Sequence, residues 1–116
     1  METTRQLIEQ LRQHQFHIST AESCTGGMIA SMLVGVSGAS EVFEEGYVTY
    51  SNEVKIKNLG VSAETIRKYT VVSGPVAEEM AKGAADRSGA ALALSTTGYA
   101  SFFGVFVPIA LIIGSF

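Results

Sequence analysis

A serine and a cysteine stand beside two glycines at residues 20–27, which read Thr-Ala-Glu-Ser-Cys-Thr-Gly-Gly. An alternating apolar and polar run precedes this stretch, as in a half-buried strand, and apolar residues at helical spacing follow it. A sharp turn from strand to helix can present a nucleophile, so Ser23 and Cys24 are the first candidates for chemistry. The alternative is a capped helix start in which Cys24 packs as a small hydrophobic residue.

Backbone N–H groups at the same turn suggest a second role. Gly26 and Gly27 let the chain turn tightly and approach a ligand closely, and free N–H groups at a helix start attract negative charge. We therefore expect the N–H groups at this turn to attract a negatively charged group of a ligand.

The elements around this turn follow an α/β order. We expect one helix capped by Thr3 or Thr4 and further helices that begin after residues 27, 51, 62 and 73. Strands are expected near residues 16–19, 42–51 and 90–98, and Gly46 marks a bulge or a close approach in the second. This order predicts a three-layer α/β/α sandwich with a mostly parallel sheet.

Hydroxyl groups gather at the ends of the three expected strands, at residues 21–23, 49–52 and 95–98. Sites in such sheets form at the carboxyl ends of the strands, so these segments should converge. The pattern is typical of a binding site for a small polar ligand, but hydroxyl groups at these positions also cap helices.

Composition restricts the class of protein. A chain of 116 residues forms one domain at most, and its net charge of −3 gives no basic surface for nucleic acid. One cysteine forms no internal disulfide, and the N-terminus lacks the apolar core of a secretory signal, so we expect a cytoplasmic protein. Neither His14 nor His17 has a second ligand at metal-binding spacing, so we expect no metal.

The last 29 residues, 88–116, carry no charged side chain. Their first part reads as a buried strand that ends in a polar turn. The apolar run at residues 102–113 is interrupted by Gly104 and Pro108 and is shorter than the ~20 residues of a membrane span. Membrane association through this tail is therefore an alternative but not the main interpretation.

Three motifs in register resemble the C-terminal domain of the CinA (competence/damage-inducible protein) family, whose stand-alone members are nicotinamide-nucleotide amidases. They are Ala-Glu-Ser-Cys-Thr-Gly-Gly at 21–27, Thr-Tyr-Ser-Asn-Glu-Val-Lys at 49–55, and Val-Ser-Gly-Pro-Val-Ala-Glu-Glu-Met-Ala at 72–81. The resemblance covers residues 1–98.

The resemblance implies that nicotinamide mononucleotide is hydrolysed to nicotinate mononucleotide and ammonia by a serine and a lysine, without metal or cofactor. The matching residues are Ser23 and Lys55. For this reaction we expect the backbone N–H groups around Thr25, Gly26 and Gly27 to hold the oxyanion. The resemblance also implies a homodimer. The residues expected to bind the nucleotide, from the resemblance and from the strand ends above, are Glu22, Thr25, Gly26, Gly27, Ser40, Tyr50, Ser51, Asn52, Thr97 and Gly98.

Several roles stay open on the sequence. Lys55 can act as a base only if burial or positive charge lowers its pKa; otherwise it is a solvated helix lysine. Glu22 either orients Lys55 or accepts N–H bonds at the helix start. Tyr50 either stacks on the pyridine ring or packs in the core. The acylated residue could be Ser23, Ser40 or Ser51.

After Gly98 the sequence departs from the family, which continues with a glycine-rich loop, two more strands and a helix. We expect residues 1–98 to be an incomplete amidase domain and residues 99–116 a foreign apolar tail, from truncation or a shifted reading frame. The loss should remove a phosphate-binding loop and leave one sheet edge unpaired and one face uncovered. The chain would then be a crippled amidase or a non-catalytic interaction or nucleotide-binding module.

Overall fold

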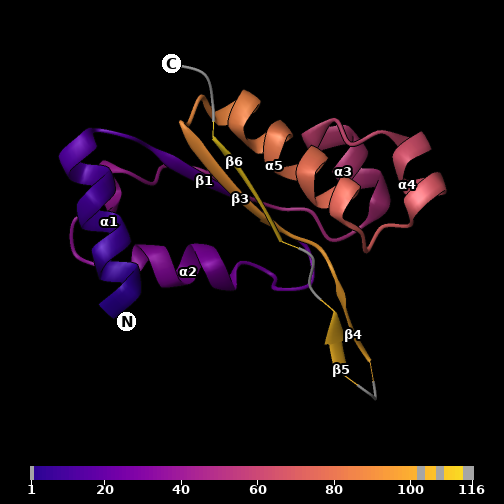
Figure 1. Cartoon of the computed structure of the whole chain (residues 1–116), viewed down its shortest axis with the longest axis horizontal. Coiled ribbons are helices and arrows are strands. Elements are labelled where there is room, and N and C mark those ends of the chain that lie inside the picture. Colours follow the sequence, from indigo (N-terminus) through magenta and orange to yellow (C-terminus); the bar gives the residue numbers. More distant parts are fainter. Residues whose placement is uncertain (1, 102–103, 107–108, 114–116) are drawn as a thin grey trace.

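The computed structural model describes residues 2–101, 104–106 and 109–113. A central sheet lies between two layers of helices, with α1 and α2 on one side and α3, α4 and α5 on the other (Figure 1). The helices are α1 (Glu2–His14), α2 (Met28–Val34), the short 3-10 helix η1 (Ala39–Glu41), α3 (Asn52–Leu59), α4 (Ala63–Tyr69) and α5 (Gly74–Ser88).

The sheet has the strand order β2-β1-β3-β6. At its centre β1 (Ile18–Glu22) pairs in parallel with β2 (Gly46–Val48) and with β3 (Leu92–Thr96). At one edge β6 (Ile109–Ile113) pairs antiparallel with β3. The expected α/β sandwich with a mostly parallel sheet is confirmed, and the three hydroxyl-rich strand ends lie side by side.

Each face of the sheet has its own hydrophobic core. Ala21 and Ala93 pack against the small residues of α5, whereas Ile18 packs against α1 and α2. Successive side chains along a strand point to opposite faces, so the two cores alternate along β1. The same alternation sends Glu22 toward α2 and Ser23 toward the α3 and α5 layer.

The second strand is much shorter than the sequence predicted. Instead of extending over residues 42–51, β2 has three residues. Val42 and Phe43 belong to a turn closed by η1, because both of their N–H groups donate to the carbonyl of Ala39. The close approach expected at Gly46 is confirmed, since a Cβ there would lie 2.6 Å from the Thr20 hydroxyl oxygen.

Helix boundaries follow capping chemistry at Ser51, Ser62 and Ser73 and depart from it at the start of α1. The Ser51 and Ser73 hydroxyl oxygens accept N–H bonds at the starts of α3 and α5, as expected. The expected cap at Thr3 or Thr4 is wrong, because α1 already begins at Glu2 and both threonines lie in its first turn.

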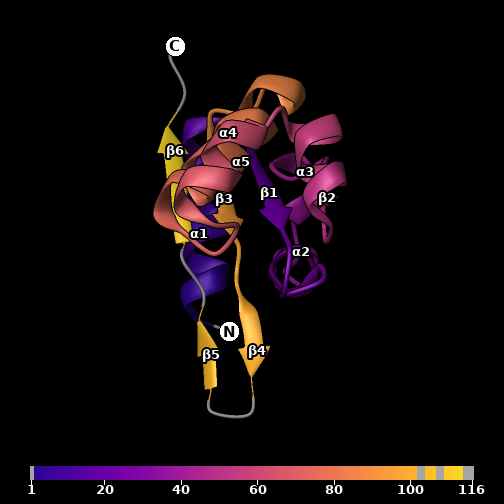
Figure 2. The same cartoon turned by 90° about the vertical axis from the view of Figure 1, so that its right-hand side faces the viewer.

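The described part of the tail forms strands. A hairpin of β4 (Tyr99–Ser101) and β5 (Gly104–Phe106) extends beyond the sheet, and β6 then returns along β3 (Figure 2). Residues 99–116 were expected to be a foreign tail that leaves one sheet edge unpaired, whereas β6 pairs antiparallel with β3 along its outer edge.

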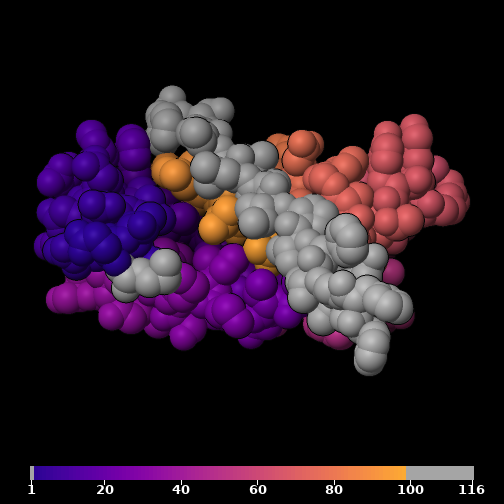
Figure 3. Space-filling view, turned by 60° about the horizontal axis from the view of Figure 1, so that its bottom comes forward, coloured from indigo at the N-terminus to yellow at the C-terminus, as the bar shows by residue number. Residues whose placement is uncertain are grey.

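The α1 and α2 side of the sheet is only partly covered. Atoms of β3 reach the surface beside α2 (Figure 3). There an apolar groove is lined mainly by Leu7, Ile29, Met32, Leu33 and Leu94.

No helix among the described residues has both the length and the apolar character needed to cross a membrane. The expected apolar run at 102–113 lies partly outside the described residues, namely at 102–103 and 107–108. Its last five residues form β6.

Gly83 sets the distance between α5 and α3, because a Cβ at this position would overlap the backbone carbonyl of Leu59. Gly83→Ala should push α3 away and lower the free energy of unfolding by about 1–3 kcal/mol, measured by urea denaturation. The matched control is Gly74→Ala, where no atom lies within 4 Å of the added methyl group. Equal stability of the two variants would contradict this account of the contact.

Candidate active site

Ser23 and Lys55 meet at the carboxyl end of the sheet, although 32 positions separate them in the chain. The Lys55 Nζ donates to the Ser23 Oγ over 2.9 Å and to the carbonyl oxygens of Thr49 and Tyr50, each over 2.8 Å. Lys55 is 1% exposed and Ser23 is 4% exposed. The arrangement is a buried amine that touches a hydroxyl group.

Helix α3 positions the lysine. Ser51 caps the helix, and the backbone N–H of Lys55 makes the first regular helical bond back to the Ser51 carbonyl. Long side chains in helices point toward the helix N-terminus, so the Lys55 side chain reaches back past the cap. Its amine therefore meets the two carbonyl groups that precede Ser51.

The flanking strand ends hold the serine. The Ser23 N–H donates to the Thr96 carbonyl over 3.2 Å, and the Thr49 N–H donates to the Glu22 carbonyl over 2.8 Å. The chain then turns through Gly26 and Gly27, whose φ angles of 61° and 105° lie in the left-handed region that favours glycine. The hydroxyl is thus fixed where β1 gives way to α2.

Burial lowers the pKa of Lys55 below its ordinary value, because the charged amine has lost its water. In the described part of the chain, no carboxylate lies within ion-pair distance of Lys55. A neutral amine has two protons and one lone pair. In the neutral form the two carbonyl groups, which can only accept, would take both protons, and the lone pair would face the Ser23 hydroxyl in place of the N–H that the protonated amine donates to it.

The lowered pKa has a consequence for stability. Between the pKa of Lys55 in the folded chain and its higher value in the unfolded chain, the unfolded state binds more protons, so stability rises with pH in that window. We expect the parent protein to gain free energy of unfolding relative to Lys55→Met as the pH rises from 7 to 10. Urea denaturation at several pH values measures this difference, and a constant difference would contradict the prediction.

Glu22 is fully buried on the opposite face of β1. Its carboxylate accepts from the N–H groups of Ile29 and Ala30, over 2.9 and 3.0 Å, and from the Thr25 hydroxyl over 2.7 Å. Two roles were considered for Glu22. The structure shows that it accepts N–H bonds at the start of α2 and does not orient Lys55.

Hydrogen bonds within the turn reduce the number of N–H groups that could act as oxyanion donors. Glu22 occupies N–H groups in the first turn of α2, and the Gly26 N–H donates to the Ser23 carbonyl. Within the described residues, the N–H groups of Thr25 and Gly27 have no hydrogen-bond acceptor. Neither donor is therefore used by the part of the chain that the structure describes.

The Tyr50 side chain is 77% exposed, which excludes the alternative that it packs in the core. The Ser51 oxygen accepts a helix N–H, and Asn52 is exposed at the start of α3. Thr97 is buried and donates to the Val71 carbonyl, and Gly98 follows it.

Ser40 is not brought to the Ser23 and Lys55 pair. It lies exposed in η1, and η1 leads to Val42, whose carbonyl accepts from Ile18 at the start of β1. Ser23 follows the other end of that strand. Among the three serines considered as nucleophile, Ser23 is the one whose hydroxyl contacts the Lys55 amine.

Thr96 was not singled out from the sequence. Its hydroxyl oxygen lies 2.9 Å from the Thr25 hydroxyl oxygen, and its carbonyl accepts from Ser23. The signal that could have found it is the hydroxyl-rich end of the third strand, to which Thr96 belongs. Cys24 is a partly exposed free thiol beside the serine.

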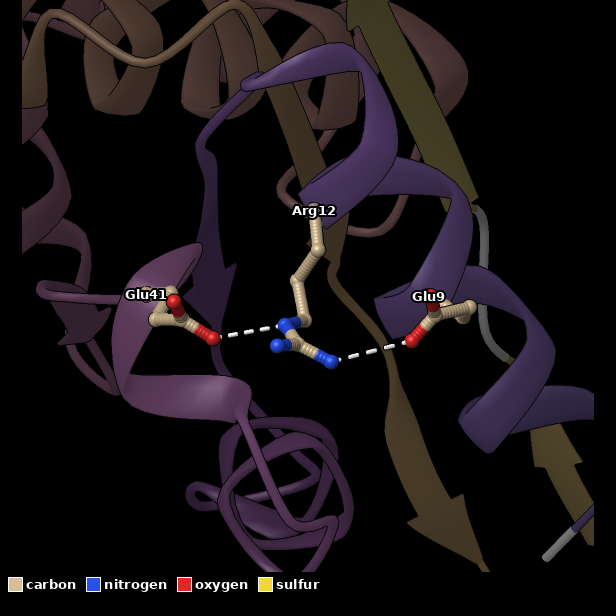
Figure 4. Close-up of polar contacts among 3 residues, drawn as sticks. All are labelled: Glu9, Arg12 and Glu41. Atoms are coloured by element: carbon tan, nitrogen blue, oxygen red, sulfur yellow. Dashed lines mark hydrogen bonds and ion pairs between the residues drawn. The ribbon is translucent and has the colours of Figure 1, made fainter.

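A second polar cluster lies at the amino end of β1. The Arg12 side chain donates to Glu41 over 2.6 Å and to Glu9 over 3.0 Å (Figure 4). The hydrogen bond and the charge of Glu41 raise the pKa of Arg12 above its ordinary value. This exposed cluster ties α1 to η1. No group of three or more metal-ligating side chains occurs among the described residues.

The model of the CinA C-terminal domain matches residues 1–102. A CinA-like protein of Kosmotoga olearia is 51% identical over 94 residues, which are 81% of this chain and 23% of the relative. A CinA-like protein of Chloroherpeton thalassium is 50% identical over 92 residues, covering 79% of this chain and 22% of the relative. The chain thus spans about a fifth of the length of these curated relatives.

Solved structures agree with the sequence comparisons. The competence/damage inducible protein CihA of Agrobacterium tumefaciens superposes with a TM-score of 0.90 at 39% identity, over 97% of this chain and 72% of that one. A CinA superfamily protein of Escherichia coli superposes with a TM-score of 0.85 at 32% identity, over 97% of this chain and 75% of that one. The structural likeness therefore extends past Gly98.

Proposed function

The chain belongs to the CinA family, because residues 1–102 match the C-terminal domain of that family, and on this premise we propose that it is a nicotinamide-nucleotide amidase-like hydrolase. The substrate would be nicotinamide mononucleotide, and the products nicotinate mononucleotide and ammonia. The observation that carries the proposal is the 2.9 Å contact between the buried Lys55 amine and the Ser23 hydroxyl. A serine needs such a base, because an amide is a poor electrophile.

In the first half of the reaction the Ser23 Oγ attacks the amide carbon while its proton moves to the Lys55 Nζ. The N–H groups of Thr25 and Gly27 are the available donors for the oxyanion. When the intermediate collapses, the carbon–nitrogen bond breaks, and Lys55 returns the proton to the departing nitrogen. Ammonia leaves and an acyl ester remains on Ser23.

In the second half a water molecule attacks the ester, again with Lys55 taking the proton. The ester bond breaks, the Ser23 oxygen recovers a proton from Lys55, and the carboxylic acid product then ionises. A substrate with a cationic pyridinium ring fits this cycle, because its charge disfavours the protonated form of Lys55. The exposed Tyr50 ring offers a surface on which such a ring can stack.

We propose that the reaction takes place in the cytoplasm. The single cysteine is a free thiol, which suits a reducing compartment. The net charge of −3 favours a small-molecule substrate over nucleic acid.

The test is to incubate the chain with nicotinamide mononucleotide and to measure ammonia and nicotinate mononucleotide together. Equal amounts of the two products are expected. Release of free nicotinamide would indicate cleavage of the glycosidic bond and overturn the amidase proposal. Binding detected by calorimetry without ammonia release would favour the alternative function, a non-catalytic nucleotide-binding module.

A further inference from the structure

The Glu22 carboxylate is buried without an ion-pair partner among the described residues, one position before Ser23. Both of its oxygens are used: one accepts from Ile29 and Thr25, and the other from Ala30. Burying a carboxylate is costly unless hydrogen bonds satisfy it, and these bonds do so. The carboxylate is therefore tied to the turn that follows Ser23 and to the helix behind it.

The hydroxyl groups of Thr25 and Thr96 extend this connection in one direction. A carboxylate can only accept, so the Thr25 hydroxyl proton points to Glu22. In the 2.9 Å contact between the two threonine hydroxyls, Thr96 must then be the donor. The chain of hydrogen bonds runs from Thr96 on β3 through Thr25 in the turn to Glu22 on β1.

Ser23 lies between the two tied residues, Glu22 and Thr25. Thr96 makes a second contact with residues 22–25, because its backbone carbonyl accepts the Ser23 N–H. All of these side-chain bonds lie on the α2 face of β1, whereas the Lys55 contact lies on the α3 face. The backbone of Ser23 is thus fixed from the side away from its base.

We propose that Glu22, Thr25 and Thr96 are positioning residues that hold the Ser23 hydroxyl against Lys55. Their side chains act through the backbone of the turn and do not touch the substrate, which replaces the substrate-binding role expected for the side chains of Glu22 and Thr25 and leaves the Thr25 N–H as a donor to the oxyanion. The inference rests on the proposed role of Ser23 as nucleophile. A mere cap of α2 would contribute to stability but would leave the reactivity of the folded enzyme unchanged.

The test uses Thr96→Val, which removes the hydroxyl and keeps the shape, and Thr96→Ser, which restores a hydroxyl. The matched control is Ser95→Ala on the same strand, whose buried hydroxyl donates to the Ala77 carbonyl on the opposite face. Two readouts apply: the rate at which a fluorophosphonate probe labels Ser23 between pH 6 and 10, and kcat and KM for nicotinamide mononucleotide.

For Thr96→Val we expect the limiting labelling rate and kcat to fall about tenfold or more, since small misplacements of a reacting group are costly. KM and the midpoint of the pH profile should stay near the parent values. Thr96→Ser should recover most of the rate, and Ser95→Ala should label like the parent.

Parent-like labelling by fully folded Thr96→Val would overturn the positioning role and leave the amidase proposal intact. Glu22→Gln provides a second variant, because the amide NH₂ of glutamine cannot accept from the N–H groups that Glu22 binds. Parent-like labelling of this variant would also overturn the positioning role. A parent protein that neither labels at Ser23 nor releases ammonia would overturn the proposed function, and this inference with it.

Discussion

Ser23→Ala is expected to lower the rate of ammonia release from nicotinamide mononucleotide by roughly 10⁴-fold or more, because no covalent intermediate can then form. The fold should persist, since the Ser23 side chain contributes the contact to Lys55 and a long 3.5 Å contact to the Tyr50 carbonyl. Steady-state kinetics with an ammonia assay measures the loss, and circular dichroism checks the fold.

Cys24→Ala is the matched control for this variant. The two residues are neighbours, and the thiol is the other nucleophile at the turn. We expect Cys24→Ala to keep the activity of the parent. If Cys24→Ala lost activity and Ser23→Ala did not, the nucleophile would be the thiol and the serine mechanism would be wrong.

Lys55→Met is expected to lower the same rate by about 10²–10⁴-fold, the usual contribution of a general base. Methionine keeps the length and the apolar character of the side chain, so the loss reports the missing amine. Lys55→Arg should be equally inactive, because a guanidinium stays protonated and has no lone pair for the Ser23 proton.

The pH profile gives this prediction a second readout. Only the neutral amine accepts a proton, so kcat/KM of the parent should rise with pH. The midpoint should lie below the ordinary lysine pKa of about 10.4, because burial lowers the pKa of Lys55. The control is Lys57→Met, since Lys57 is exposed on the same helix. A parent-like profile in Lys55→Met would remove Lys55 from the mechanism.

Much of the fold could be predicted because it depends on local chemistry. Ser51 and Ser73 are found as helix caps because a serine oxygen before a helix accepts a free N–H. Residues 42–51 misled the prediction because aromatic and β-branched residues suit a strand and a buried turn equally well. Val42 lies in such a turn, where η1 supplies the hydrogen bonds that a strand partner would otherwise supply.

The candidate site, too, could be predicted only in part from the sequence. The motifs around Ser23 and Lys55 indicate which hydroxyl and which amine to consider, but no spacing in the chain determines the 2.9 Å between them. Parallel pairing of β1 and β2, together with the capped start of α3, determines that distance. Ser40 illustrates the limit, since a residue expected in the pocket lies near the other end of β1.

The sequence by itself determined the α/β order, the family resemblance and the chemical types at the turn, because these depend on neighbouring residues and on motifs. Tertiary structure alone decided that Lys55 is buried, that Glu22 faces away from it, and that β6 completes the sheet beside β3. The physical reason is that burial, strand pairing and the face of a strand depend on contacts between segments far apart in the chain.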